Sequence, residues 1–211
     1  LIPDGENLCV KAYKLLHSVY SLPGVRIYLH KIIPMGAGLG GGSSDAAYTL
    51  KLLNSLLALQ ISTDKLKEYA LTLGSDCPLF VDETPQYAEG RGELLNKINI
   101  DLKGKYLLLI HPNIHISTVE AFATISPKES NSCKRIVEKD IHSWKTDLVN
   151  DFEKSVFPNH PELADIKEKL YSLGADYAAM SGSGSTMFGI FSNPILHDDW
   201  PKHYFVWQSV L

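Results

Sequence analysis

The sequence predicts an α+β protein with two domains. In the N-terminal half, a glycine-rich loop lies between a strand-like and a helix-like pattern. From Lys105 onward, patterns of strand, helix, helix, strand, strand and terminal strand follow, which is typical of an α+β sandwich of the ferredoxin-like kind. We place the boundary near residues 99–104, which gives an N-terminal domain over residues 1–100 and a C-terminal domain over residues 101–211.

The first part of the chain predicts a turn at Pro3 to Gly5 and one helix with apolar positions between Leu8 and Val19. An amphipathic strand over residues 25–32 follows. Too few sheet partners precede this strand for a stable half-buried sheet. Because the chain also opens at Leu1 without an initiator Met, we expect an N-terminal portion to be missing from this sequence.

Five glycines fall within the seven positions from Gly36 to Gly42, in the stretch P-M-G-A-G-L-G-G-G-S-S-D-A-A. Glycine reaches positive φ freely and lets a ligand approach the backbone, at an entropic cost that an ordinary connection does not carry five times. A strand is expected before the loop, and a helix with inward positions from Ala46 to Leu57 after it, capped by a residue within Ser43 to Asp45. Because the first amides of a helix have no intrahelical partner, the loop predicts an anion site, most simply for phosphate.

Two other phosphate-binding motifs fit this loop less well. Gly36, Gly38 and Gly41 match the G-x-G-x-x-G dinucleotide fingerprint, but a second helix follows where that motif requires a parallel strand, and Asp64 looks like the cap of that helix. A Walker A loop requires a lysine at the position that Ser43 occupies. A plain glycine-rich turn is the remaining, purely structural interpretation.

A second helix is predicted over Thr63 to Thr72, followed by L-G-S-D-C-P-L-F at residues 73–80. Gly74 is a good stop for that helix, and Pro78 prevents it from resuming. Asp76 on this turn has two interpretations. Either it caps the next turn, or it faces the anion site, where a carboxylate is tolerated if it accepts a proton or helps to hold a cation.

The C-terminal domain begins with a short apolar strand over residues 106–110, which Pro112 ends. We expect the following elements after it: a helix capped by Ser117 and Thr118, an exposed loop over 126–132, helices over 141–155 and 161–173, and strands over 177–180, 187–191 and 204–207. The S-G-S-G-S-T stretch at 181–186 is either a hairpin turn or a second amide-rich bend that closes over an acceptor or a phosphoryl group.

Composition narrows the partners and the compartment. The formal net charge of −4 gives no electrostatic footprint for nucleic acid, and no apolar run approaches the roughly twenty residues of a membrane span, so we expect neither as a partner. Cys9, Cys77 and Cys133 are odd in number without C-x-x-C spacing, which favours reduced thiols in a cytoplasmic protein. His111 and His115 have the spacing of a helical metal pair, but a proline between them argues against a helix, and no metal site is predicted.

The first glycine-rich stretch resembles the ATP-binding motif of the GHMP kinases, the family of galactokinase, homoserine kinase and mevalonate kinase. Further segments resemble the branch of this family that phosphorylates a cytidine diphosphate derivative of methylerythritol. These segments are E-N-L-C-V-K-A at 6–12, K-I-I-P at 31–34, L-G-S-D-C-P-L-F at 73–80, Y-A-E-G-R-G-E at 87–93 and H-P-N-I-H-I-S-T-V-E-A-F at 111–122. The S-G-S-G-S-T stretch at 181–186 resembles the third motif of the GHMP kinases. These matches follow the family's order, so together they are far more specific than one glycine motif.

The resemblance implies an N-terminal domain like ribosomal protein S5 and a ferredoxin-like C-terminal domain. It implies an enzyme, monomeric or homodimeric, that uses ATP and magnesium to phosphorylate the 2-hydroxyl of that acceptor in the non-mevalonate route to isoprenoid precursors. Asp76 is expected to be the base, or the orienting carboxylate, for this hydroxyl. Its lysine partner is expected in an N-terminal A-K-x-N segment, which this sequence does not contain.

The resemblance also assigns binding residues. The expected ATP-binding residues are Pro34, Met35, Gly36, Ala37, Gly38, Leu39, Gly40, Gly41, Gly42, Ser43 and Ser44, with Asn7 and Lys31 near the adenosine. The expected acceptor-binding residues are Thr118, Phe122, Gly182, Ser183 and Gly184. Phe122 either stacks on the pyrimidine or is a core residue of its helix.

Two alternatives to this function stay open. One is another GHMP kinase, of the homoserine or mevalonate type, which a requirement for cytidine in the acceptor would exclude. The other is a non-catalytic nucleotide-binding relative or fragment, which would bind ATP without transferring its phosphoryl group.

Overall fold

The computed structural model describes residues 7–126, 132–195 and 199–211. The chain divides into two compact units. Unit 1 comprises Leu1–Ile32 and Gly40–Ile98, and unit 2 comprises Ile33–Leu39 and Asn99–Leu211. The predicted turn at Pro3 to Gly5 and most of the predicted loop over 126–132 lie outside the described residues, and the domain boundary near residues 99–104 stays a prediction.

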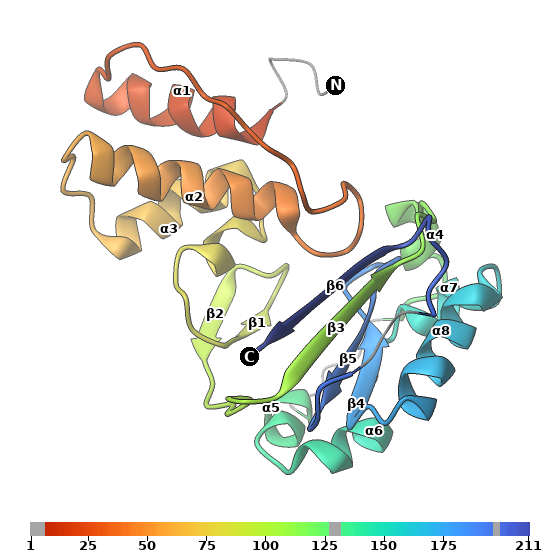
Figure 1. The fold of residues 1–211 in the computed structure, drawn as a ribbon. Coiled ribbons are helices and arrows are strands. Elements are labelled where there is room, and N and C mark those ends of the chain that lie inside the picture. The colour runs from red at the N-terminus through yellow and green to blue at the C-terminus, as the bar shows by residue number, and fades with distance from the viewer. Residues whose placement is uncertain (1–6, 127–131, 196–198) are drawn as a thin grey trace. The chain divides into compact units, whose positions relative to one another are not determined.

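Unit 1 is built on three helices, α1 (Leu8–Tyr20), α2 (Gly41–Leu56) and α3 (Thr63–Leu73), which pack against one another (Figure 1). Side-chain caps fix two of their starts, because Asn7 accepts a hydrogen bond from the Cys9 amide and Ser62 accepts one from the Lys65 amide. The core between the helices contains small and branched apolar side chains, namely Ala12, Leu16, Ala46, Ala47, Leu50, Leu53, Leu66 and Ala70. The inward face predicted for α2 is thereby confirmed, and its alanines let the helices approach closely.

The predicted cap of α2 is wrong. The helix begins at Gly41, and its N-cap is Gly40, which has a left-handed backbone (φ +64°) and no side chain with which to cap. The predicted candidates, Ser43, Ser44 and Asp45, therefore lie inside the first turns of the helix. Glycine occupies the N-cap position because the chain enters the helix there with a positive φ, which glycine adopts without strain.

The predicted strand over residues 25–32 is also wrong. The segment has no strand assignment and pairs with neither sheet of the described residues. Ile27, Tyr28 and Leu29 expose 42%, 88% and 40% of their surface. Alternation of apolar and polar residues defines two faces, but a strand also needs a neighbouring strand that accepts and donates its backbone hydrogen bonds.

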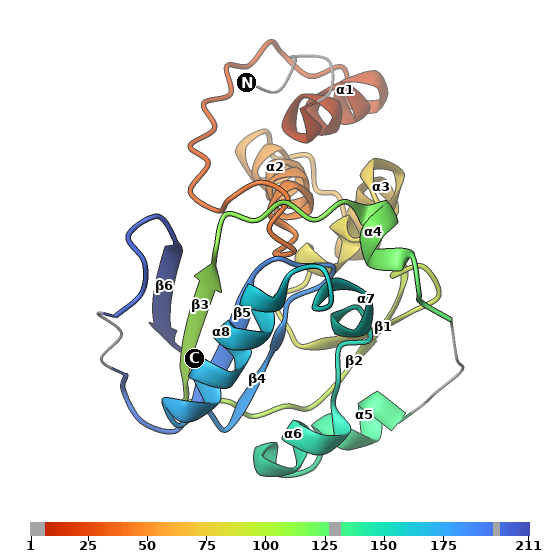
Figure 2. The same ribbon diagram turned by 90° about the vertical axis from the view of Figure 1, so that its right-hand side faces the viewer.

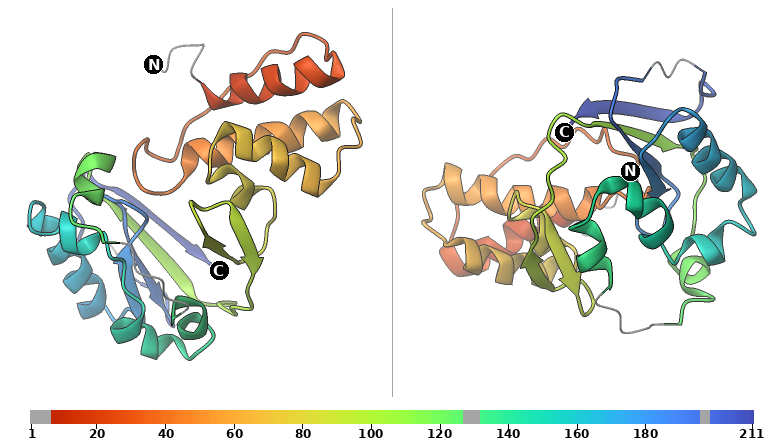
Figure 3. Two further views of the ribbon diagram at one scale, coloured as in Figure 1. Left: turned by 180° about the vertical axis from the view of Figure 1, so that it is seen from behind. Right: turned by 90° about the horizontal axis from the view of Figure 1, so that it is seen from below.

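Unit 1 ends in a short 3₁₀ helix and a hairpin. Gly74 ends α3 as predicted, and the 3₁₀ helix η1 (Cys77–Phe80) follows Asp76 directly. Strands β1 (Gln86–Glu89) and β2 (Leu94–Lys97) then pair antiparallel, as Figure 3 shows. The tip between them contains the G-R-G sequence, with positive φ at both glycines.

Unit 2 is an antiparallel four-stranded sheet covered by helices. The strands are β3 (Tyr106–His111), β4 (Tyr177–Met180), β5 (Met187–Phe191) and β6 (Phe205–Val210), in the order β4-β5-β3-β6. Helix α8 (Pro161–Ser172) packs on β4 and β5 across one face (Figure 2). The buried residues on this side are Leu108, Ile110, Met180, Met187, Phe191, Leu163, Ile166 and Leu170. The sheet, its strand order and the helical layer confirm the predicted α+β sandwich.

Helices in the middle of unit 2 differ from the prediction. Helix α4 (Thr118–Phe122) is capped by Ser117 as expected, and α5 (Ser132–Val137) was not predicted. The single helix predicted over 141–155 is instead three short pieces, η2 (Ile141–Ser143), α6 (Trp144–Asp147) and α7 (Glu153–Val156). Helix α6 ends at Leu148, where the backbone adopts an extended conformation (ψ 97°). The side chain of Asn150 then caps the next turn, because its Oδ1 accepts a hydrogen bond from the Phe152 amide.

None of the helices in the described part of the chain has the length and apolar character that crossing a membrane requires.

Candidate active site

The first glycine loop (residues 34–44) begins in unit 2, where it contacts the second glycine loop (residues 181–186). The Ser181 hydroxyl donates a hydrogen bond of 2.8 Å to the carbonyl of Gly38. The Thr186 amide donates one of 3.2 Å to the carbonyl of Ala37, which is 2% exposed. The two loops that the sequence singled out are therefore in direct contact.

Glycine is required where these loops meet. Gly38 has φ +74°, and a Cβ there would lie 2.2 Å from the carbonyl oxygen of Ser181 and 2.7 Å from that of Gly184. A Cβ on Gly182 would lie 3.1 Å from the Gly38 oxygen. Met35, which precedes Gly38 in the first glycine loop, is 64% exposed. Backbone packs on backbone, so no side-chain rotation would relieve a substitution at Gly38.

The second half of the first glycine loop belongs to unit 1 and forms the start of α2. The Ser44 amide donates to the Gly40 carbonyl at 2.9 Å, which is the first hydrogen bond of the helix. The amides of Gly41, Gly42 and Ser43 precede this bond, and no side chain caps the helix. A helix start of this kind offers backbone N–H groups and the positive end of the helix dipole to an anion.

The turn that carries Asp76 packs on this helix start within unit 1. Helix η1 contacts α2, and a Cβ on Gly40 would lie 2.7 Å from Cζ of Phe80. Burial raises the pKa of the Cys77 thiol, although a hydrogen bond with Ser43 acts in the opposite direction. Asp76 is thus attached to the first turn of α2 by the residue that follows it.

Asp76 occupies the N-cap position of η1, as the simpler interpretation expects, but its carboxylate is exposed and makes no capping hydrogen bond there. It accepts a long hydrogen bond of 3.4 Å from the Ser75 hydroxyl. A Cβ on Gly92, at the tip of the β1–β2 hairpin, would lie 3.3 Å from Oδ1 of Asp76. Sequence reasoning did not place this hairpin beside Asp76, although the G-x-G of its tip was visible.

Asn7 and Lys31 have structural contacts within unit 1. The Asn7 side chain caps α1. Lys31 forms an ion pair of 2.5 Å with Asp45 of α2, and both side chains are about a quarter exposed. The Lys31–Asp45 pair connects the extended segment before the loop to the helix after it.

The predicted acceptor residues of α4 lie on the surface of unit 2. Thr118 is exposed in the first turn, and Phe122 is 55% exposed, so the interpretation of Phe122 as a core residue is wrong. The Phe122 ring meets Phe152 edge to face, with centroids 4.8 Å apart. More than half of the surface of Phe122 is thus open to contact with a ligand.

Two supports of the second glycine loop were missed by sequence reasoning. His111, at the end of β3, is 5% exposed, and its Nδ1 lies 3.1 Å from the Ser185 hydroxyl, which donates to the Ile114 carbonyl at 2.5 Å. Because the Ser185 hydroxyl donates its one proton to the Ile114 carbonyl, Nδ1 of His111 donates to the Ser185 oxygen. Burial lowers the pKa of His111. The second support, Asn150, donates to the carbonyls of Met180 and Gly182.

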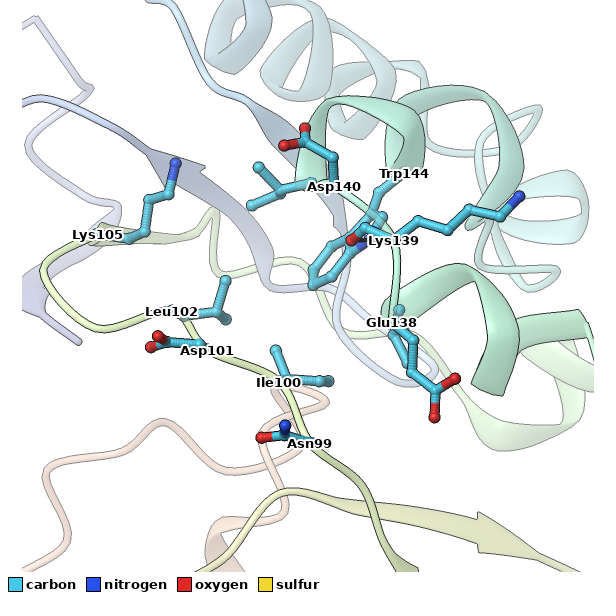
Figure 4. A pocket seen from close by; sticks show the side chains of 11 residues that line it. Asn99, Ile100, Asp101, Leu102, Lys105, Glu138, Lys139, Asp140 and Trp144 are labelled. Carbon is cyan, nitrogen blue, oxygen red and sulfur yellow. Dashed lines mark hydrogen bonds between the residues drawn. The ribbon is translucent and has the colours of Figure 1, made fainter.

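A separate pocket of about 450 Å³ lies in unit 2, near the start of β3 (Figure 4). Two segments line it, residues 99–105 and 137–144. Its side chains carry both charges, and Lys105 is held by Asp176 at 3.0 Å. None of the predicted site residues lines this pocket. It is distinct from the glycine loop contact, which forms beyond the opposite end of β3.

Comparison with known proteins places the chain in a family. Residues 7–82 match the model of the GHMP kinases N terminal domain, and residues 132–198 match that of the GHMP kinases C terminal domain. A solved 4-(cytidine 5'-diphospho)-2C-methyl-D-erythritol kinase is 30% identical, with a TM-score of 0.78 over 96% of this chain and 77% of its own. A homoserine kinase from Cytophaga hutchinsonii has a TM-score of 0.76 at 15% identity, over 99% of this chain and 77% of its own, and shares the fold alone.

The chain belongs to the GHMP kinase family, whose members use ATP. Within the family it groups with proteins named 4-diphosphocytidyl-2-C-methyl-D-erythritol kinase. The one from Bacteroides fragilis is 51% identical over 187 residues, which are 88% of this chain and 68% of that protein. The one from Bacteroides thetaiotaomicron is 47% identical over 209 residues, 98% of this chain and 76% of that protein.

Proposed function

We propose that the protein transfers the γ-phosphoryl group of ATP to the 2-hydroxyl of 4-diphosphocytidyl-2-C-methyl-D-erythritol, in the methylerythritol phosphate route to isoprenoid precursors. The names of its relatives support this acceptor. The observation that carries the proposal is the packing of the Asp76 turn on the first turn of α2. The start of α2, which suits phosphate, and the exposed carboxylate of Asp76, which makes no capping hydrogen bond, therefore lie in the same part of unit 1.

Phosphoryl transfer needs positioning, neutralisation of charge and an acceptor oxygen in line with the γ-phosphate. In this proposal, the amides from Gly36 to Ser44 bind the triphosphate, with the positive-φ glycines bringing the backbone close to it. Asp76 orients the acceptor hydroxyl and accepts its proton. Asn7 and Lys31 lie near the adenosine in this proposal. Asn7 caps the start of α1, and Lys31 is paired with Asp45 near the start of α2.

Magnesium is the expected metal ion. In the described ranges, no three His, Cys, Asp or Glu side chains come together as a metal site. Magnesium in kinases is held mainly by substrate phosphates with one or two carboxylates, and Asp76 is an exposed carboxylate of that kind. When bound, the ion neutralises charge on the triphosphate.

The acceptor binds, in this proposal, to residues of unit 2. Phe122 stacks its open face on the cytosine ring, and Thr118 lies one helical turn before it. The second glycine loop meets the phosphoryl groups at Gly182, Ser183 and Gly184, with the amides of Gly182 and Ser183 as donors, because the Gly184 amide already donates to the Ser181 carbonyl at 3.0 Å. We further propose that the protein acts in the cytoplasm as a monomer or homodimer, in keeping with its free cysteines.

The test is ADP release by the full-length protein with magnesium and ATP, with each of three acceptors in turn. Stimulation by 4-diphosphocytidyl-2-C-methyl-D-erythritol, and by neither homoserine nor mevalonate, is the expected result. Stimulation by one of the other two would assign a different GHMP activity. ATP binding by calorimetry without transfer to any acceptor would favour a non-catalytic relative.

A further inference from the structure

The side chain of Asn150 uses every hydrogen-bonding group it has. Its Nδ2 donates to the carbonyl of Met180 and to that of Gly182, at 2.7 Å each. Its Oδ1 accepts from the Phe152 amide at 3.0 Å. An amide has two donor protons and a carbonyl oxygen, so it meets both carbonyls and the amide at once. Asn150 therefore joins the α6–α7 turn to the second glycine loop.

A second side chain from the same segment completes this attachment. Glu153 is 9% exposed, and its Oε1 accepts from the Met180 amide at 2.9 Å. Its Oε2 is paired with Lys167 of α8 at 2.5 Å, which compensates the buried charge. Asn150 thus binds the carbonyl of Met180 and Glu153 binds its amide, so both bonds come from one short segment of the chain. Met180 is the last residue of β4, so the strand enters the second glycine loop from a fixed end.

The fixed loop is the one that contacts the first glycine loop. Gly182 follows Ser181, whose hydroxyl binds the Gly38 carbonyl. The Gly182 carbonyl faces Asn150, and Gly182 has a left-handed backbone (φ +53°) that sets the direction of the next amides. Two hydrogen bonds, joined by the peptide bond between Ser181 and Gly182, therefore connect Asn150 to Gly38.

We propose that Asn150 is a positioning residue for phosphoryl transfer, which fixes the second glycine loop so that its amides meet the acceptor side of the reaction. This rests on the proposed function. In this proposal Asn150 acts through the backbone of Met180 and Gly182, to which its amide is bonded. An aspartate has nearly the same shape and keeps the bond from Phe152, but it turns a carboxylate oxygen toward two carbonyl oxygens and repels both.

The test compares Asn150→Asp and Asn150→Ser with the matched surface variant Asn193→Asp, whose parent side chain is exposed. Hydrogen exchange of residues 177–187 is followed by mass spectrometry, together with kcat and KM for both substrates. We expect faster exchange confined to this segment in Asn150→Asp, with kcat/KM for the acceptor lowered about 100-fold, the scale of a misplaced reacting group. The KM for the acceptor rises, whereas a smaller folded fraction would lower kcat and leave KM unchanged. Asn193→Asp behaves as wild type.

Unchanged exchange and unchanged acceptor KM in a folded Asn150→Asp would overturn the proposal. If Asn150→Asp does not fold, Asn150→Ser decides, because serine can still cap the Phe152 amide but cannot reach both carbonyls. The exchange of residues 177–187 is independent of activity. A wild-type protein without kinase activity would thus refute the proposed function, while exchange in the variants still tests whether Asn150 fixes the loop.

Discussion

Ser181 and Gly38 are 143 positions apart in the sequence, and the hydroxyl of one donates to the carbonyl of the other at 2.8 Å. The bond joins the middle of the first glycine loop to the start of the second. Each loop alone has an ordinary explanation as a turn. Turn formation within each loop does not explain their contact, in which a Cβ on Gly38 would lie 2.2 Å from the Ser181 oxygen and one on Gly182 would lie 3.1 Å from the Gly38 oxygen.

Gly38→Ala should disable the contact between the loops. The new Cβ would lie 2.2 Å from a backbone oxygen, at a residue with φ +74°. We expect a loss of stability of about 1–3 kcal/mol and an ATP affinity at least tenfold weaker, measured by urea unfolding and calorimetry. Gly24→Ala is the control, because a Cβ there meets nothing within 4 Å. Equal ATP affinity in the two variants would contradict a role of this contact in ATP binding.

Gly40→Val should weaken ATP binding by moving the start of α2. Valine is strained at φ +64°, and its Cβ would lie 2.7 Å from the ring of Phe80. The structural reason is thus packing against Phe80, in addition to crowding of bound phosphates. In the double variant Gly40→Val/Phe80→Ala, the clash with the ring is removed and the backbone strain stays, so we expect only partial recovery in calorimetry. Wild-type affinity in Gly40→Val would refute the loop as the ATP site.

Phe122→Ala should weaken acceptor binding at little cost in stability. The ring is 55% exposed and loses mainly its contact with Phe152. We expect the KM for the cytidine-containing acceptor to rise about tenfold, from a lost stacking interaction of about 0.5–1.5 kcal/mol and the area it buries, with the KM for ATP unchanged. Val119→Ala, at an 83% exposed neighbour, is the control. An unaltered acceptor KM in Phe122→Ala would remove Phe122 from the site.

The buried His111 should make stability depend on pH. Burial lowers its pKa in the folded state, whereas in the unfolded chain the imidazole titrates near 6.5. As pH falls below about 6.5, the unfolded state takes up a proton before the folded state does, so stability is lost. Urea unfolding at pH 7.5 and 5.5 should show a larger loss for the wild type than for His111→Gln. The same loss in both proteins would show that His111 does not contribute.

Much of the fold could be predicted because its signals are local. The inward face of α2, the stop at Gly74 and the strands of unit 2 follow from periodicity and from glycine and proline chemistry. The strand over 25–32 failed because strand pairing is not local, and neither sheet of the described residues includes this segment. The helix over 141–155 failed because Asn150 finds its carbonyl partners 30 and 32 positions away.

The candidate site shows the same division. The sequence and its family resemblance singled out both glycine loops and Asp76 as candidates without any structure. Their supports were not predictable, because His111, Asn150 and Gly92 act through contacts with distant segments. Nothing in the local sequence around Asn150 distinguishes a residue that holds a loop from one that only caps a turn.

The most direct test of the central claim is the Asp76→Asn variant of the full-length protein, assayed for phosphoryl transfer from ATP to 4-diphosphocytidyl-2-C-methyl-D-erythritol. Asp76 is exposed and its carboxylate makes no capping hydrogen bond, so the variant should fold as wild type and bind ATP within a few-fold of it. We expect kcat to fall at least 100-fold, as general-base catalysis contributes roughly that much or more. Asp64→Asn, in the first turn of α3, is the matched control and should keep its activity. Wild-type turnover in Asp76→Asn would contradict the account.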